Sequence, residues 1–158
     1  VGSVFAEVIL DNGLTFGAEI VPMSADVTDA THQRTDTSVT ASGEGVTGTN
    51  TRKADAEVEN FTTIYAEVPI GALFLKAGIS QIDVNTLETN LENGVSYKND
   101  TLDGITYGIG IKGEYAGFYT KLAGEITDFD EYKSTSQTNT ITADVDLKQI
   151  KFSIGKAF

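Results

Sequence analysis

Apolar and polar residues alternate with a period of two along most of the chain. The last eleven residues, KQIKFSIGKAF, show this pattern clearly. Their large apolar side chains share one parity: Ile150, Phe152, Ile154 and Phe158. Side chains at every second position lie on the same face of a β-strand, whereas a helix would need a spacing of three to four. The pattern therefore predicts an all-β protein.

The same alternation, interrupted by stretches rich in Gly, Asn, Ser and Thr, divides the chain into seven predicted strands. We place them at 1–10, 14–27, 56–68, 73–86, 101–112, 117–129 and 142–158. The chain has 158 residues, which is the length of one domain, and we expect a single domain over 1–158.

The connections between these strands fall into two classes. Three are short, at 11–13, 69–72 and 113–116, and the first contains an Asn-Gly pair typical of a tight hairpin. Three are long and polar, at 28–55, 87–100 and 130–141. Within the first of these, TSVTASGEGVTGTNT contains no aromatic residue, and we expect a mobile loop that contacts the surroundings. Short turns at one end and long loops at the other are typical of an outer-membrane β-barrel.

The two faces of the predicted strands differ in character. One face is apolar over about nine residues per strand, the length that a tilted strand needs to cross a bilayer. The opposite face carries eight charged residues, namely Glu7, Glu19, Glu67, Lys76, Lys112, Lys121, Glu125 and Lys151. Isolated charges are costly in a dry core, but four Glu and four Lys can pair inside a narrow barrel. We therefore expect a neutral ion-pair network that fills the lumen.

The number of strands carries a further expectation. Short turns at the periplasmic end make the strand 1–10 run downward, and bacterial single-chain barrels have an even number of strands. We therefore predict an antiparallel, up-and-down, transmembrane β-barrel of eight strands, of which seven are visible and the first lies before Val1. An open barrel would leave unpaired backbone groups facing lipid.

Acidic residues follow the apolar series at the end with the long loops. Four of them, Asp128, Asp130, Asp144 and Asp146, are expected on two paired strands. Carboxylate oxygens suit Ca²⁺ or Mg²⁺, so this patch is a candidate for weak divalent cation binding, with a bridge to lipopolysaccharide phosphates. The alternative is a solvated collar that prevents aggregation.

Composition excludes several function classes. The net charge is −12 and the sequence pI is about 4.3, which disfavours binding to nucleic acid. The chain has no Cys, so it offers neither a disulfide framework nor a Cys-based zinc site. Its single His, His32, has no identifiable nucleophile as a partner. We expect no catalytic site and no tightly bound cofactor.

Several segments resemble the small bacterial outer-membrane barrels of the OmpA and OmpW types and the porin-like proteins of marine Gram-negative bacteria. These segments are ILDNGLTFGAEIVP, TTIYAEVPIGALFLKAGIS and GITYGIGIKGEYAGFYTKLAGEITDFD. The alternating C-terminus that closes on Phe158 resembles the terminal-strand signature of that class, here Ile150, Phe152, Ile154 and Phe158. The resemblance implies recognition by the barrel assembly machinery, although Lys156 stands where that signature often has an aromatic residue.

The favoured function is that of a non-enzymatic integral outer-membrane protein with a plugged lumen, serving envelope structure or surface contact. Its expected partners are outer-membrane lipid and lipopolysaccharide, and the residues specify neither an extracellular partner nor an oligomeric state. One alternative is the C-terminal part of a larger porin with an aqueous channel. A second alternative is a soluble, secreted β-sandwich that acts as a binding module.

Overall fold

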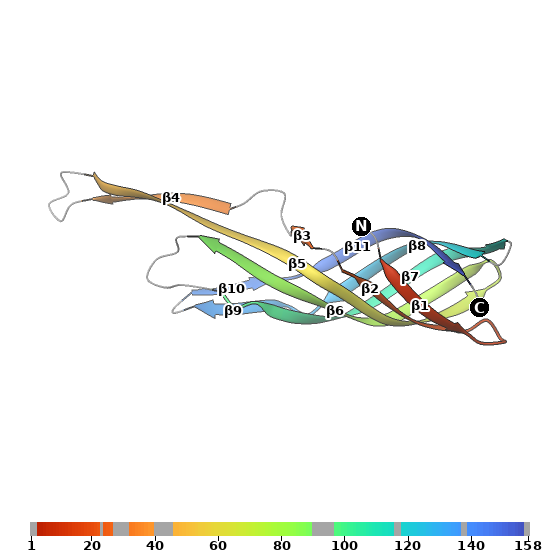
Figure 1. Ribbon diagram of the computed structural model, residues 1–158. Helices are drawn as coiled ribbons and strands as arrows, with labels where there is room; N and C mark the ends of the chain where they lie inside the picture. The colour runs from red at the N-terminus through yellow and green to blue at the C-terminus, as the bar shows by residue number, and fades with distance from the viewer. Residues whose placement is uncertain are drawn as a thin grey trace.

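The fold was obtained as a computed structural model, which describes residues 3–22, 24–26, 32–39, 46–89, 97–115, 118–136 and 139–156. These residues form β-strands and their connections (Figure 1). The described part of the chain contains no helix that is long and apolar enough to cross a membrane.

Seven strands follow one another around a single curled sheet. They are β1 (Val4–Ile9), β2 (Thr15–Val21), β5 (Val46–Ile70), β6 (Leu73–Thr89), β7 (Asp100–Tyr115), β8 (Phe118–Phe129) and β11 (Asp146–Lys156). Their spatial order is β1-β2-β5-β6-β7-β8-β11, and every neighbouring pair is antiparallel. The strong curl makes this sheet a half-barrel (Figure 1). The predicted all-β, antiparallel fold is confirmed, and each of the seven predicted strands overlaps one of these strands.

Tight turns join the strands at one end of the half-barrel, which we call the short-turn end. Gly13 has a φ of +82° in the turn between β1 and β2, and the Asn12 side chain accepts a hydrogen bond from the Leu14 amide at 3.0 Å. Gly71 has a φ of +66° between β5 and β6. Glycine has no Cβ and adopts such backbone angles without strain, so these residues fix short hairpins.

The opposite end, which we call the long-loop end, differs from the prediction. Two of the three predicted loops contain additional strands: β4 (His32–Val39) pairs with β5 in the predicted loop 28–55, and β9 (Tyr132–Ser136), in the predicted loop 130–141, pairs with β10 (Asn139–Ala143). The short strand β3 (Ala25–Asp26), within the predicted strand 14–27, also pairs with β5. The loop predicted at 37–51 lies partly in β4 and β5, and its residues 40–45 are outside the described ranges. Backbone hydrogen bonding along a paired strand explains how a Thr-rich stretch becomes ordered without a large apolar content. The β4–β5 hairpin extends well beyond the half-barrel (Figure 1).

A β-bulge interrupts the pairing of β5 with β6. Glu59 is opposite Asp83 and Thr62 is opposite Gln81, so two residues of β5 face a single residue of β6. Asn60, one of these two, has a φ of +53°. An extra residue exchanges the two faces of a strand, because side chains alternate with a period of two. The residues of β5 that face inward therefore have odd numbers on the short-turn side of the bulge and even numbers on its long-loop side.

Candidate functional site

The outer face of the half-barrel is apolar at the short-turn end. Many of its large side chains are exposed, among them Val8, Phe16, Ile64, Ile79, Ile105, Ile109, Leu122 and Phe152. Ile64, Ile79 and Ile105 are directly opposite one another across β5, β6 and β7, and each is more than 60% exposed. A monomeric soluble protein rarely exposes an apolar surface of this extent. This face is suited to contact with another apolar medium.

The apolar band ends at a defined position on each strand. Its last large apolar residues toward the long-loop end are Ile20, Ile64, Ile79, Ile105, Ile126 and Ile150 on β2, β5, β6, β7, β8 and β11. The next outward residues on the last four strands are Gln81, Asp103, Asp128 and Lys148. The change from apolar to polar therefore occurs within one step of the alternation on each of these strands.

The boundary is oblique to the strands. Ile20 is opposite Thr62, which lies one outward position above Ile64 on β5. Ile150 is opposite Gly124, whose partner on β7 is Ile109, two outward positions below Ile105. The boundary thus drops by six residues across the five strand pairs from β2 to β11. With about 3.3 Å per residue and about 4.8 Å between strands, its inclination is about 40°. This value falls within the tilt of roughly 35–45° that strands have relative to a barrel axis. A boundary with this inclination to the strands is perpendicular to such an axis.

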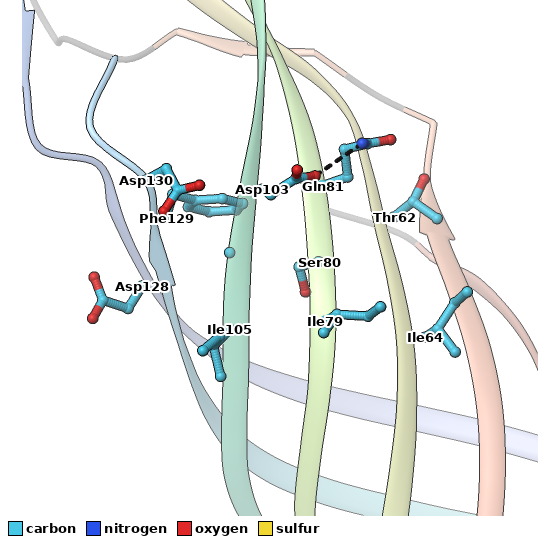
Figure 2. A pocket seen from close by; sticks show the side chains of 11 residues that line it. Thr62, Ile64, Ile79, Ser80, Gln81, Asp103, Ile105, Asp128, Phe129 and Asp130 are labelled. Atoms are coloured by element: carbon cyan, nitrogen blue, oxygen red, sulfur yellow. Dashed lines mark hydrogen bonds between the residues drawn. The ribbon is translucent and has the colours of Figure 1, made fainter. Parts of the chain in front are cut away.

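A polar collar begins directly above the apolar band. The Gln81 amide donates a hydrogen bond to Asp103 at 3.0 Å, and Asp83 accepts hydrogen bonds from Asn60 at 3.1 Å and Thr101 at 2.8 Å. A shallow groove of about 660 Å³ follows this boundary. Figure 2 shows Ile64, Ile79 and Ile105 at one level, with the Gln81–Asp103 pair beyond them.

The inner face carries a closed ring of four charges near mid-height. Lys76 Nζ lies 2.8 Å from Glu125 and 3.4 Å from Glu19, while Lys151 Nζ lies 2.6 Å from Glu19 and 3.0 Å from Glu125. Each Lys thus contacts both carboxylates, and the ring is neutral. It joins β2, β6, β8 and β11, so it crosses the space enclosed by the sheet. Glu19, Lys76 and Glu125 are each only 5% exposed, so water does not separate these charges.

A second charged group lies beside the ring and contains one more carboxylate than ammonium. Lys121 Nζ lies 2.8 Å from Glu67 Oε1 and also contacts Glu7 Oε1, which accepts a hydrogen bond from the Tyr65 hydroxyl at 2.6 Å. The ammonium of Lys76 lies 3.9 Å from the centroid of the Tyr65 ring, at cation–π distance. Tyr65 therefore connects the two groups.

A chain of hydroxyl groups crosses the inner face next to the charges. Thr63 and Ser80 share a hydrogen bond of 2.8 Å, Ser80 and Thr106 one of 2.5 Å, and Thr106 and Thr127 one of 2.6 Å. These four residues come from β5, β6, β7 and β8 and are almost completely buried. A hydroxyl can donate and accept at once, so the chain satisfies four neighbouring polar groups without water.

An apolar cluster closes the inner space toward the long-loop end. It contains Phe61, Ile82, Val84, Leu102, Phe129 and Tyr132, with Val21, Val58, Val145 and Leu147 packed against it. The rings of Phe61 and Phe129 meet edge to face at 6.1 Å. The Tyr132 hydroxyl donates to the Lys98 carbonyl at 2.8 Å, and the Ser134 hydroxyl accepts from the Lys98 amide at 3.0 Å. The start of β9 is thus fixed to the residues that precede β7. We call this cluster the apolar cap.

The structure brings together seven of the eight charged residues predicted for the lumen. Lys112 is the exception, because its Nζ lies 5.7 Å from the centroid of the Tyr119 ring and forms no salt bridge with another described residue. Its register partner is Lys121, and the two ammonium groups repel each other. The described network therefore contains four Glu and three Lys.

The other predicted sites are only partly brought together. Asp128 is directly opposite Asp146, as the predicted pairing of the two strands requires, while Asp130 and Asp144 follow and precede the paired segments. No three carboxylates or histidines among the described residues lie close enough to hold a metal ion. Within the terminal signature, Ile150, Phe152 and Ile154 are outward and exposed on β11, and Phe158 lies outside the described residues.

Sequence reasoning missed the apolar cap and the hydroxyl chain. The chain of hydroxyls could have been found from the inner parity, because Thr63, Ser80, Thr106 and Thr127 are all inward and become neighbours once the strands are paired. The cap had a signal in the order Ile82-Asp83-Val84-Asn85, where the apolar parity of β6 changes from odd to even. The cap is not visible when one apolar parity is assigned to a whole strand.

Comparisons of the chain with protein-family models, with curated proteins and with solved structures gave no match.

Proposed function

We propose that the protein is a non-enzymatic, integral outer-membrane β-barrel with a sealed lumen, serving envelope structure or surface contact. In this proposal the apolar band faces hydrocarbon, the polar collar lies at the outer surface, and the β4–β5 and β9–β10 hairpins project outward. The barrel is closed by an eighth strand, as expected from the sequence.

The oblique boundary of the apolar band is the observation that carries the proposal. A bilayer surface is flat and perpendicular to the barrel axis, so it cuts tilted strands at positions that change steadily from one strand to the next. The inclination of about 40° is the one that strand tilt requires. On β8 the band runs from Phe118 to Ile126. These nine residues span about 23 Å along the axis, close to the apolar band of about 25 Å in outer-membrane barrels.

The layers inside the half-barrel support a sealed lumen. The charge ring spans the space between opposite strands, the hydroxyl chain is dry, and the apolar cap lies between them and the long-loop end. An ion that passed through would have to break paired charges and then enter an apolar layer, and both steps are costly. These contacts favour a structural or adhesive role over transport.

The same observations bear on the alternatives. A wide porin channel needs a hydrated interior, whereas the interior side chains here contact one another across the lumen. A soluble β-sandwich buries apolar side chains between two sheets. Here the larger apolar face is the exposed outer face of the curled sheet, and the described residues contain no second large sheet that could cover it. Both alternatives fit the geometry less well than the sealed barrel.

The decisive experiment measures contact with lipid. Single Cys variants of the refolded protein at Leu75, Ile109 and Phe152 carry a spin label, and the relaxation of the label by a lipid-soluble paramagnetic reagent is compared with its relaxation by a water-soluble one. We expect the lipid-soluble reagent to have the stronger effect at all three sites. A label at Asp83, on β6 above the boundary, is the matched control and should respond to the water-soluble reagent. Equal access of the water-soluble reagent to all four labels would refute the membrane setting.

A second experiment tests the seal. The full-length protein is inserted into planar bilayers and the conductance is recorded. We expect no open-channel steps, because charge pairs and the apolar cap leave no hydrated path. Stable steps of nanosiemens size, as for a porin, would overturn the sealed lumen while leaving the membrane setting intact.

A further inference from the structure

The two edge strands of the half-barrel cannot pair directly in the antiparallel manner of the rest of the sheet. Each neighbour reverses direction, so the first and seventh strands of the path, β1 and β11, run the same way. Both run toward the short-turn end. One strand inserted between them would run the opposite way and would be antiparallel to both. A second copy in the same membrane would present only edges of the same direction, so it could not provide this strand.

A groove lies between these edges. It has a volume of about 470 Å³. Its walls include Ser3 and Phe5 from the start of the chain and from β1, and Ile150, Phe152 and Ser153 from β11, and its floor includes Phe61 and Ile82. We call this groove the seam. Its outer rim is apolar on both sides, with Val4 and Val8 on β1 and Phe152 on β11.

Polar atoms beside the seam have partners missing. Glu7, on β1, has one buried carboxylate oxygen, Oε2, without a hydrogen bond to a described residue, and Gln149, on β11, has a buried Nε2 atom in the same condition. Glu7 also belongs to the charged group in which two carboxylates share the single ammonium of Lys121. A buried carboxylate in excess is costly unless a cation approaches it. Glu7 lies on β1, one of the two strands that border the seam.

We infer that the seam is a binding site for one further β-strand of the same polypeptide, which carries an inward-facing cationic side chain against Glu7. This inference rests on the proposed function, because an edge surrounded by hydrocarbon must be paired within the barrel itself. The strand runs from the short-turn end to the long-loop end. Its outward residues are apolar, to continue the rim formed by Val8 and Phe152, and its inward residues near Gly155 are small, because the Tyr119 ring lies over that glycine.

Cross-linking across the seam tests the strand. Residues 1–158 contain no Cys, so double variants made in the full-length protein and studied in phosphatidylcholine vesicles meet no competing thiol from this part of the chain. One pair is Ala6→Cys with Phe152→Cys, and another is Ala6→Cys with Ile154→Cys. If one strand lies between β1 and β11, these two strands are two spacings, or about 9.6 Å, apart. A disulfide needs Cα atoms within about 7 Å of each other, so it cannot bridge this distance. We expect no disulfide on oxidation but efficient cross-linking by a bis-maleimide of about 10 Å.

The control pair is Ala6→Cys with Ala18→Cys, which are register partners and should form a disulfide readily. A disulfide across the seam would mean that β1 contacts β11 directly and would overturn the inference. Failure of both reagents across the seam, with the control intact, would mean a gap wider than one strand and would also overturn it. Neither result depends on whether lipid or water surrounds the barrel, so the seam can fail separately from the membrane setting.

The sign of a single substitution tests the cation. Without an additional cation, Glu7→Gln removes the excess carboxylate and leaves Lys121 paired with Glu67, so the folded state should be unchanged or favoured. If the further strand supplies a cation, Glu7→Gln leaves this cation without a carboxylate partner. We then expect at least a tenfold fall in the folding equilibrium constant in vesicles. Glu57→Gln, on β5 and outside the charged groups, is the control and should change it less than threefold. A stable or stabilised Glu7→Gln protein would refute the cation.

Discussion

The two ends of the half-barrel are built by opposite rules on the same strands. Below the boundary the outer face is apolar and the inner face carries Glu, Lys and Thr. Above it, the outer face carries residues such as Asp83 and Asp103, and the inner face carries Ile82, Val84 and Leu102. On β6 the large apolar residues change from the outer face to the inner face between Ile79 and Ile82. Along this one strand, the outer face therefore changes from a surface suited to an apolar medium to a surface suited to water.

The position of the boundary can be located from the side chains alone, without a bound ligand or lipid. A strand in water buries its apolar side chains inside, and a strand in hydrocarbon turns them outward. In the membrane setting that we propose, the level at which one rule replaces the other marks the edge of the hydrocarbon. Substitutions placed on either side of the boundary should therefore have different, and sometimes opposite, effects.

The largest difference is expected for a buried charge in the lower part. Lys121→Met leaves Glu7 and Glu67 without their ammonium partner, and the free energy of unfolding should fall by about 3–5 kcal/mol. Chemical unfolding in vesicles, followed by far-ultraviolet circular dichroism, measures this loss. The control Lys133→Met removes an exposed Lys of β9 and should change stability by about 0.5 kcal/mol or less. Equal losses for the two variants would contradict the buried network.

A charge on the outer face should distinguish the two parts directly. Ile109→Arg places a cation in the middle of the apolar band and should cost about 2–4 kcal/mol in vesicles. Gln81→Arg places the same cation just above the boundary, where the cost should be about 0–1 kcal/mol. Unfolding in vesicles gives both values. A small cost at Ile109 together with a small cost at Gln81 would argue that both sites face water.

The hydroxyl chain should show a smaller effect. Thr106→Val keeps the shape of the side chain but removes the central hydroxyl, so Ser80 and Thr127 each lose a partner. We expect a loss of about 1–3 kcal/mol in the free energy of unfolding. Thr120→Val, at an outward position of β8 within the apolar band, should be neutral or stabilising. If both valine variants had the same effect, the chain of hydroxyls would have no special role.

The smallest effect is expected at the bulge. Asn60→Val places a β-branched residue at a φ of +53° and should destabilise the fold by about 1–2 kcal/mol relative to Asn60→Gly, which tolerates this angle. Both variants lose the hydrogen bond to Asp83, so their difference isolates the backbone term. Unfolding midpoints measured side by side provide the comparison. Equal midpoints would show that the backbone at Asn60 relaxes without cost.

The lower part of the fold could be predicted from the sequence because its signals are local. Alternation identified the strands, and an Asn-Gly pair marked the first turn. Charges on one parity predicted eight residues, and these include all seven residues of the two inner charged groups. Lys112 could not be separated from the others, because the same parity does not fix height within the barrel. Its position beside Lys121 depends on the register between β7 and β8.

The upper part could not be predicted in the same way because two of its determinants are not periodic. The bulge at Asn60 adds one residue and reverses the faces of β5, which an alternation pattern cannot reveal in advance. The stretch 46–55 has few large apolar residues, and it forms a strand through backbone pairing with β4 and β6. Backbone hydrogen bonds carry no sequence signature of their own.

The bulge also makes the length of β5 more important than the chemistry of any one residue in it. Removing Asn60 would restore an unbroken alternation and rotate everything above it by half a period. Val58 would then turn to solvent, and Glu57 and Glu59 would turn toward Phe129 and Ile82 in the apolar cap. A one-residue deletion at this point would exchange the two faces of β5 on the long-loop side of the bulge, whereas many substitutions there would leave them in place.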